Sequence, residues 1–391
     1  MDPDTLAAHY TRFRVRERLL LTGHSHQAWP DVGFEAQQQA WLDAAEWVDD
    51  KWELAAAKAD QVRAHWRRLL QDPDGDIALG QNTHELVLRL LSALPLRARP
   101  RLVTTDGEFH TVARQLARLA EEGLDVAFVP ARPASSLAER LAAGANDATA
   151  CVLVSSVLFE TAEIVPGLDA LATACERTGV ALLVDAYHHL DAVPFDVARM
   201  GLERAFVTGG GYKYCQLGEG NAFLRVPAGC DLRPVLTGWY AEFAAIERTG
   251  RRDRVSYGIG AAAFAGATYD PTAHYRAAAV FDFHVRQGLT PERLRDISVL
   301  QVDRLKRGVE ALDLDPSLAW VEPIPDERRG GFLAIRSPRA PELANALRAR
   351  GVHCDARGDL LRLGPAPYLC DSQLDQSIDA LGDAARTLPA T

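Results

Sequence analysis

The pattern of apolar and polar residues changes its period several times along the chain. Residues 31–71 carry apolar and aromatic residues at helical spacing, which predicts helix with its tryptophans packed in the core. Four tryptophans lie in this segment: Trp41, Trp47, Trp52 and Trp66. Beyond it, short runs of valine, leucine and alanine alternate with amphipathic segments. The runs that predict strands are 101–106, 125–130, 150–159 and 180–188. Apolar strands that alternate with amphipathic helices indicate a mainly parallel sheet covered by helices on both faces.

The last third of the chain has a different pattern. From about residue 290 a long helix is predicted, then a strand at 330–337, a helix at 340–351, an extended stretch at 360–364 and a last helix. The sequence therefore predicts an α/β protein with two domains. We expect an N-terminal segment at 1–30, a large domain at 31–280 and a smaller C-terminal α/β domain at 281–391.

Composition narrows the class of protein. The 391 residues are 48% hydrophobic and 25% charged, which is typical of a globular chain. A net charge of −10 argues against a nucleic-acid partner, because phosphate binding needs a basic surface. The six cysteines form no CxxC pair, which favours a reducing compartment and gives no sign of a metal site. The N-terminus lacks the apolar run of a signal peptide, and no segment approaches the roughly 20 apolar residues that span a membrane. We expect a cytoplasmic protein.

One lysine stands out because lysine is rare in this chain. Lysine occurs only at positions 51, 58, 213 and 306, against 39 arginines (43 − 4). Lys213 lies between two tyrosines in "GGGYKYCQLGEG", where the glycines let the backbone approach a ligand closely. A lysine with a depressed pKa can form an imine, whereas an arginine keeps its proton. The alternative is a glycine-rich surface loop that contains a lysine by chance.

A carboxylate precedes this lysine at the end of the previous predicted strand. Asp185 ends the run "VALLVD", and His188 follows it. In a parallel sheet both Asp185 and Lys213 then face the crevice at the carboxyl ends of the strands. The pair suits pyridoxal phosphate, because Lys213 would form the Schiff base and Asp185 would keep the pyridine nitrogen protonated. For Asp185 alone, a helix cap or turn is the alternative.

The cofactor's phosphate and ring need further partners. The segment "GQNTHEL" predicts a helix N-terminus, which favours an anion. Thr83 would add its hydroxyl, and His84 and Glu85 their amides, unless the motif is a plain helix cap. Phe109 or His110 follows a predicted strand, where a ring that stacks on the cofactor is expected. A buried core phenylalanine is the alternative for Phe109.

These motifs together resemble the class V aminotransferase group of fold-type-I pyridoxal-phosphate enzymes, and within that group kynureninase. The family's Asp-x-x-His pair is matched by "DAYHH", and its Tyr-Lys-Tyr by Tyr212, Lys213 and Tyr214. The family's phosphate-binding tryptophan is matched by Trp239 in "LTGWYAEF". A further family segment near the phosphate resembles "FAGATYDPT", and its C-terminal arginine motif resembles "CDARGDLLRLGPAPYLC".

The resemblance implies roles for the matched residues. Arg362 would bind the carboxylate of an amino-acid substrate, with Lys213 and Asp185 as catalytic residues. Tyr212 would contact the phosphate or relay a proton. The remaining matched residues are implied to bind the cofactor or substrate: His188, Trp239, Thr268 and Asp270. The resemblance further implies hydrolytic Cβ–Cγ cleavage that releases alanine, and a homodimer in which Trp239 or Asp270 serves the neighbouring subunit.

The chain also departs from the family pattern. His110, Thr111 and Val112 replace a Pro-Ser-Asp motif, which removes a polar contact to the cofactor. The stretch "TGHSHQAWP" replaces an Asn-Ser-rich stretch near the substrate. Its histidines, His24 among them, predict a different substrate pocket, with turn caps as the alternative.

Other functions stay open on the sequence. A cysteine desulfurase needs a mobile thiol near the carboxylate-binding arginine, and Cys354 lies eight residues before Arg362 (362 − 354). A class V aminotransferase or another lyase would use the same cofactor site with a different pocket. A cofactor-binding regulator without catalysis is the non-enzyme alternative, although the intact set of Asp185, Lys213 and Arg362 argues against it.

Overall fold

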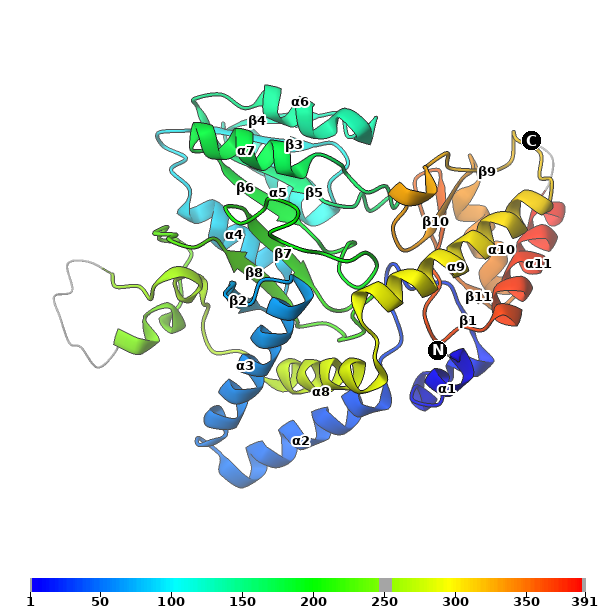
Figure 1. The fold of residues 1–391 in the computed structure, drawn as a ribbon, viewed down its shortest axis with the longest axis horizontal. Helices are drawn as coiled ribbons and strands as arrows, with labels where there is room; N and C mark the ends of the chain where they lie inside the picture. The colour runs from blue at the N-terminus through cyan, green and yellow to red at the C-terminus, as the bar shows by residue number, and fades with distance from the viewer. Residues whose placement is uncertain (1, 246–254, 389–391) are drawn as a thin grey trace.

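The computed structural model describes residues 2–245 and 255–388 and contains a larger and a smaller unit (Figure 1). The larger unit is built on a seven-stranded sheet with the order β2-β8-β7-β6-β5-β3-β4. Its strands are β2 (Asp76–Gly80), β3 (Arg101–Thr105), β4 (Asp125–Val129), β5 (Thr149–Ser155), β6 (Ala181–Asp185), β7 (Phe206–Gly210) and β8 (Ala222–Val226). From β7 to β4 the neighbours are parallel, and only β8 runs antiparallel to both of its neighbours. The predicted α/β class with a mainly parallel sheet is confirmed.

Helices cover both faces of this sheet. The covering helices are α4 (Thr83–Ala93), α5 (His110–Glu121), α6 (Leu137–Gly144) and α7 (Leu168–Thr178). Every residue of β5 is buried, because alternate side chains point to opposite faces. Val152 and Val154 join the core that contains α6 and α7, whereas Cys151 and Leu153 join the core that contains α4 and α5. This explains why the strand has a continuous apolar run rather than an alternating one.

The segment 31–71, predicted as helix, forms two separate helices. These are α2 (Asp31–Trp47) and α3 (Lys51–Leu69), which pack against α8 (Thr272–Gln287) at the bottom of Figure 1. The chain turns between them at Val48, whose φ of 49° ends α2. The prediction that the tryptophans pack in the core is right for Trp66, which is fully buried, and wrong for Trp41 and Trp47, which are 79% and 52% exposed. Helical spacing alone does not distinguish a face that packs on the sheet from one that points to solvent.

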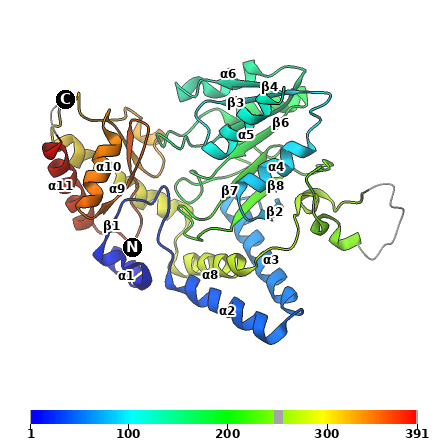
Figure 2. The ribbon, with the colours of Figure 1, turned by 180° about the vertical axis from the view of Figure 1, so that it is seen from behind.

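The smaller unit is a four-stranded antiparallel sheet with helices, and the N-terminal segment packs on it. Its strand order is β12-β13-β10-β9. Its elements are α9 (Pro291–Ala311), β9 (Trp320–Val321), β10 (Leu333–Arg336), α10 (Ala340–Ala349), β12 (Asp355–Arg357), β13 (Leu360–Leu363) and α11 (Asp371–Thr387). The N-terminal α1 (Pro3–Ala7) and β1 (Leu19–Leu20) lie beside it, and β1 pairs in parallel with β11 (Val352–His353) (Figure 2). Apolar residues of the N-terminal segment, from Leu6 to Ala28, belong to the same hydrophobic core as this unit.

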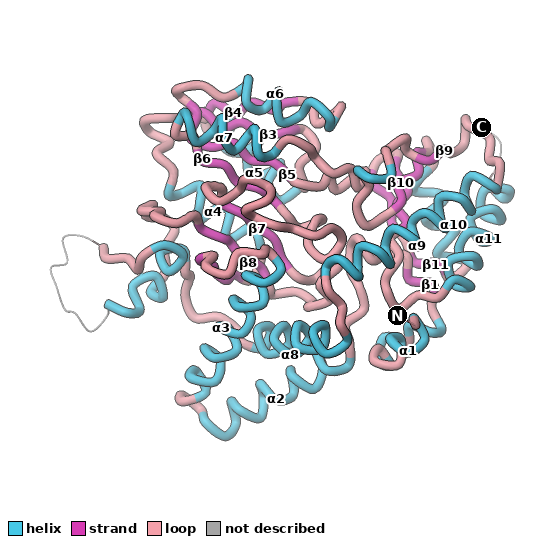
Figure 3. Tube along the Cα trace, in the orientation of Figure 1, coloured by secondary structure: helices cyan, strands magenta, loops and turns pink. Residues whose placement is uncertain are grey.

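Short 3₁₀ helices and loops connect these elements (Figure 3). The short helices are Thr11–Phe13, Val15–Glu17, Ala134–Ser136, Trp239–Ala245, Gly260–Phe264 and Asp326–Arg328. Within the described residues, no helix has both the length and the apolar character needed to cross a membrane. Strands β5, β6 and β7 run in the same direction, so their carboxyl ends share one edge of the large sheet. Asp185 ends β6, and Lys213 follows the end of β7 by three residues.

Candidate active site

Lys213 reaches into a cavity of about 200 Å³ at this edge of the sheet. Its side chain is buried, and its Nζ atom lies 2.7 Å from Nε2 of His188. Burial lowers the pKa of Lys213 to about 7; the Arg362 charge acts in the same direction, and Asp185 opposes it. A substantial fraction of this amine is therefore unprotonated at neutral pH, as a nucleophilic lysine requires. The surface-loop alternative for Lys213 is wrong.

Asp185 lines the same cavity from the end of β6. Its Oδ1 atom accepts a hydrogen bond of 2.8 Å from the backbone N–H of Tyr187. Burial raises the pKa of its carboxyl, opposed by that hydrogen bond and by the charge of Lys213. A buried carboxylate with a free oxygen stabilises a cation beside it. Asp185 therefore stabilises a turn, through the N–H of Tyr187, and also lines the cavity.

Three aromatic rings surround the Lys213 amine. The Nζ atom lies 4.5 Å from the ring centre of Tyr187, 5.1 Å from that of Phe109 and 5.5 Å from that of Tyr212. Phe109 precedes α5 and is only partly buried, so it lines the cavity and is not an ordinary core residue. Burial raises the pKa of Tyr212 to about 12, so its hydroxyl keeps its proton and acts as a donor at neutral pH. Tyr187 lies between Asp185 and His188 in the sequence, and no motif pointed to it.

The N-terminus of α4 closes another side of the cavity. Thr83 and His84 line it, and their binding of a phosphate stays a prediction. Glu85 does not: its backbone N–H donates 2.9 Å to the side chain of Asn82, and its carboxylate pairs with Arg89 at 3.2 Å. The predicted role of the Glu85 amide in phosphate binding is therefore wrong, because the helix cap already uses that donor.

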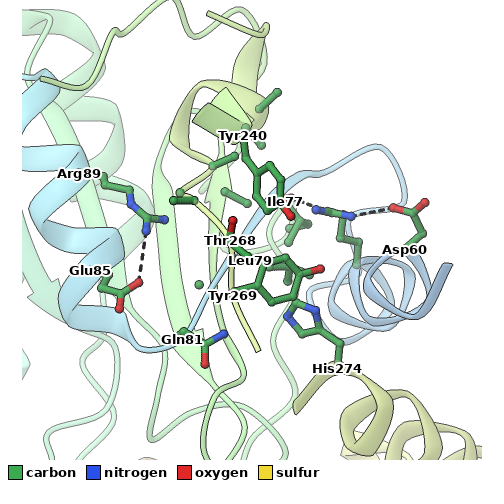
Figure 4. A pocket seen from close by; sticks show the side chains of 18 of the residues that line it. Asp60, Ile77, Leu79, Gln81, Glu85, Arg89, Tyr240, Thr268, Tyr269 and His274 are labelled. Atoms are coloured by element: carbon green, nitrogen blue, oxygen red, sulfur yellow. Dashed lines mark hydrogen bonds and ion pairs between the residues drawn. The ribbon is translucent and has the colours of Figure 1, made fainter. Parts of the chain in front are cut away.

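A second cavity, of about 530 Å³, adjoins the first (Figure 4). Gln81 lines both cavities. Thr268 lies in this second cavity and accepts a hydrogen bond of 3.2 Å from the indole N–H of Trp239. Asp270 is exposed just before α8, where its Oδ1 accepts a hydrogen bond of 2.9 Å from the N–H of Thr272. Within one chain the structure does not bring Trp239, Thr268 or Asp270 to the Lys213 cavity, and their service to a neighbouring subunit stays a prediction.

Arg362 lies buried in β13, near the Lys213 cavity but already paired. Its Nε and Nη2 atoms contact the two oxygens of Asp355 at 2.9 and 2.5 Å, and its Nη1 donates 2.5 Å to the carbonyl of Phe159. Phe159 itself lines the Lys213 cavity, which places the guanidinium behind one wall. Asp355 belongs to the "CDAR" motif, but no spacing rule pointed to its contact with Arg362.

His24 does not line the pocket as predicted. Its side chain is fully buried, and its Nε2 lies 2.8 Å from Oδ1 of Asp355. His24 is not among the residues that line the Lys213 cavity, so a contact between His24 and the substrate stays a prediction. The neighbouring His26 is exposed and stacks on Tyr212 with ring centres 4.9 Å apart.

A buried carboxylate supports the floor of the cavity beneath Phe109. Glu108 accepts hydrogen bonds from the hydroxyl of Ser155 at 2.6 Å and from Thr105 at 2.8 Å. Burial raises the pKa of Glu108 to about 7, against the effect of these hydrogen bonds. Ser155 also lines the Lys213 cavity, so its hydrogen bond to Glu108 fixes the direction of a hydroxyl at the cavity wall. No pattern in the sequence pointed to this pair.

The chain is similar to proteins of known family in its sequence and in its fold. The family model of the kynureninase C-terminal domain matches residues 294–381, which include Asp355 and Arg362. This match, the relatives and the solved structures with the same fold together support a fold-type-I pyridoxal-phosphate enzyme of class V, near kynureninase. An uncharacterized aminotransferase of Bacillus subtilis, YcbU, is 24% identical over 354 residues, which cover 90% of each chain.

Two further matches agree with this placement. A kynureninase of Bacillus cereus is 27% identical over 226 residues, which are 56% of this chain, so the match spans about half of the length of that relative (51%). The solved structure of a C-DES mutant with glycine covalently linked to its PLP cofactor superposes with a TM-score of 0.81 at 18% identity. It covers 96% of this chain and 98% of the other, and at that identity it shows the fold.

The residues of the Lys213 cavity fit pyridoxal phosphate, the cofactor of this class of enzymes. A lysine with a lowered pKa, a buried carboxylate, a ring at the cavity wall and a helix N-terminus all line one space: Lys213, Asp185, Phe109 and Thr83. Groups of these kinds can supply an imine-forming amine, a partner for a ring nitrogen, a stacking surface and a phosphate site, and these roles stay predictions.

Proposed function

We propose that this chain is a kynureninase-like enzyme that cleaves the Cβ–Cγ bond of a 3-acyl alanine by hydrolysis and releases alanine. The observation that carries the proposal is the meeting of Lys213 and Asp185 in one cavity, with Arg362 behind its wall. The match of residues 294–381 to the kynureninase C-terminal domain supports a kynureninase-like reaction, and Arg362 lies within the matched residues. Bound pyridoxal phosphate supplies an electron sink for the bonds at the substrate's Cα.

The chain's own residues would divide the work as follows. Lys213 holds the cofactor's aldehyde and, once released from it, accepts and returns a proton at the substrate's Cα. Asp185 holds the cofactor's ring nitrogen in its protonated form, and Phe109 keeps one ring face covered. Arg362 binds the substrate carboxylate through the N–H groups that Asp355 leaves unused. Tyr212 remains a proton donor at the rim of the cavity.

His188 is proposed to control the Lys213 amine. Its Nε2 contacts Nζ at 2.7 Å, and burial, together with the charge of Lys213, lowers the pKa of His188 well below its ordinary value. A neutral imidazole at this distance accepts a hydrogen bond from the amine without adding a second positive charge. Thus His188 would hold the Lys213 amine in place during the part of the reaction in which the amine is not bonded to the cofactor.

An aminotransferase is the second candidate, and the match to an aminotransferase of Bacillus subtilis over 90% of both chains favours it. The same lysine, aspartate and arginine would serve that reaction, with a keto acid as the second substrate. A desulfurase has less support. Cys354 is 2% exposed, and burial raises the pKa of its thiol to about 12, so this thiol is neither mobile nor ionised at neutral pH.

One experiment tests the proposal. The purified protein is loaded with pyridoxal phosphate beside the Lys213→Ala variant, and the visible absorbance of each is recorded before and after L-kynurenine is added. We expect a band that the variant alters, and alanine with anthranilate as products. If the band is present and neither product forms, a keto acid is added to test transamination. A protein that binds no cofactor overturns the proposal. A homodimer and a cytoplasmic location accompany this proposal and need their own measurements.

A further inference from the structure

His24 forms one end of a buried chain of polar groups that leads to Arg362. Its Nε2 lies 2.8 Å from Oδ1 of Asp355, and its ring packs against Phe332 with centres 4.7 Å apart. Burial lowers the pKa of His24 to about 4, so the ring is neutral at neutral pH. Although burial opposes it, hydrogen bonds from His24 and Arg362 hold the pKa of Asp355 below its ordinary value. An ionised carboxylate only accepts hydrogen bonds, so the neutral ring carries its proton on Nε2 and donates.

Asp355 in turn holds one edge of the Arg362 guanidinium. Its two oxygens take the Nε–H and one Nη2–H, and the Phe159 carbonyl takes one Nη1–H. Since a guanidinium has five N–H groups, two remain, one on each terminal nitrogen. A planar group fixed along one edge keeps its other donors in a constant direction, which suits a bidentate contact with a ligand carboxylate.

Two glycines fix the N-terminal segment beside β13, and this places His24. The N–H of Gly23 donates 2.8 Å to the carbonyl of Gly364, and the N–H of Gly364 donates 2.9 Å to the carbonyl of Leu21. A Cβ atom on Gly364 would lie 2.3 Å from Nδ1 of His24, and one on Gly23 would lie 2.2 Å from the carbonyl oxygen of Pro365. The absence of side chains at both positions therefore lets the histidine ring reach Asp355.

We propose that His24 is a positioning residue that acts through Asp355 to orient Arg362, so that the N-terminal segment sets the affinity of the site for the substrate's carboxylate. This inference rests on the proposed function, in which Arg362 binds that carboxylate. Without the Nε2–H donor, Asp355 loses one of the contacts that hold both of its oxygens on the guanidinium. Arg362 is then free to turn, and a ligand carboxylate has to pay for ordering it again.

The test compares two ligands that differ only in the carboxylate. L-alanine and ethylamine are titrated into the cofactor-loaded protein, and binding is followed by the change in visible absorbance. We expect His24→Leu to weaken L-alanine binding about tenfold, the value of one lost charge-assisted hydrogen bond, and to leave ethylamine binding unchanged. His24→Gln, whose amide donates to Asp355, restores the affinity. Ser25→Ala, on the same segment, serves as the matched control and binds both ligands like the parent protein.

The outcomes separate this inference from the proposed function. Equal weakening of both ligands by His24→Leu, or no weakening of either, overturns the role of His24. A parent protein that binds neither cofactor nor L-alanine overturns the proposed function instead. If His24→Leu does not fold, His24→Asn replaces it, because its shorter amide does not reach Asp355. A cofactor-free readout stands beside these: ¹⁵N-histidine NMR of the parent protein should show His24 neutral and protonated on Nε2, and an Nδ1–H form overturns the inference.

Discussion

The Nζ atom of Lys213 lies 2.7 Å from the Nε2 atom of His188, and both side chains are buried. Two positive charges at this distance in a poorly solvated site would repel strongly. The pair therefore favours a state in which the imidazole of His188 is neutral and the amine of Lys213 loses its proton easily. The lowered pKa of each partner is consistent with that state.

The first prediction concerns the pH dependence of cofactor loading. Only the unprotonated amine attacks an aldehyde, and the pKa of Lys213 is lowered to about 7. The rate at which pyridoxal phosphate bonds to the cofactor-free protein should therefore rise with pH through about 7 and then level off. Stopped-flow absorbance between about pH 5.5 and about pH 11 measures this rate. The range includes both the lowered pKa of Lys213 and the ordinary lysine pKa of about 10.4. A rate that continues to rise up to the ordinary lysine pKa would contradict the burial argument.

The second prediction concerns Asp185. Asp185→Asn keeps the shape of the side chain but removes its charge, so the cofactor's ring nitrogen loses a charged partner. The loss of one hydrogen bond to a charged group costs about 1.5–3 kcal/mol, or roughly a 10- to 150-fold lower kcat. We expect the variant still to show the absorbance of lysine-bound cofactor, since Lys213 is unchanged. Steady-state kinetics and a spectrum of the same sample decide the matter, and an unchanged kcat would remove Asp185 from the catalytic set.

The third prediction is a stability effect of Glu108. Its folded-state pKa, about 7, lies above the ordinary value of 4.5, so the folded protein holds this proton more tightly than the unfolded chain does. Its contribution to the free energy of unfolding is then complete below pH 4.5 and is lost as the pH rises through 7. Glu108→Gln removes the titrating group. Relative to this variant, the parent protein should become less stable between those pH values in urea titrations.

A control accompanies the Glu108 experiment. Asp72→Asn changes another carboxylate of the large unit, one that pairs with Arg225 at 2.8 Å and does not line the cavity. The Asp72 variant should keep the pH-dependent loss seen in the parent protein over the same range. If Glu108→Gln shows the same slope as the parent protein, Glu108 does not titrate in this range.

The sequence predicted the parts of the molecule that depend on local pattern. The strands at 101–106 and 150–159 were recognisable because they are buried on both faces, and Lys213 and Asp185 follow strand ends, where side chains face the crevice. What failed depends on contacts between distant segments. Glu85 has the right position in a helix N-terminus, but a neighbouring side chain uses its amide. His24 meets Asp355 across 331 positions of sequence, a relationship that no spacing rule contains.

The fourth prediction compares Trp41 of α2 with Trp66 of α3. Trp66 is fully buried against Phe223 and Phe281, with ring centres 4.5 and 5.1 Å away. Trp66→Ala should lower the free energy of unfolding by about 3–5 kcal/mol, because it leaves a large cavity. Trp41→Ala should change it by no more than about 0.5 kcal/mol, since its ring is exposed. Urea unfolding of both variants measures the difference, and equal losses would place the ring of Trp41 in a packed interface.

The fifth prediction separates the proposed hydrolase from a desulfurase. Cys354 packs in the core of the smaller unit, next to the Asp355 that holds Arg362. A thiol that attacks substrate sulfur must reach the cofactor, whereas the Cys354 thiol is buried and its pKa is raised to about 12. Cys354→Ala should therefore keep kcat for alanine release within about twofold, at a stability cost of about 1 kcal/mol for the lost sulfur. Loss of the reaction in a variant that remains folded, with sulfide released from L-cysteine by the parent protein, would instead make this cysteine the nucleophile.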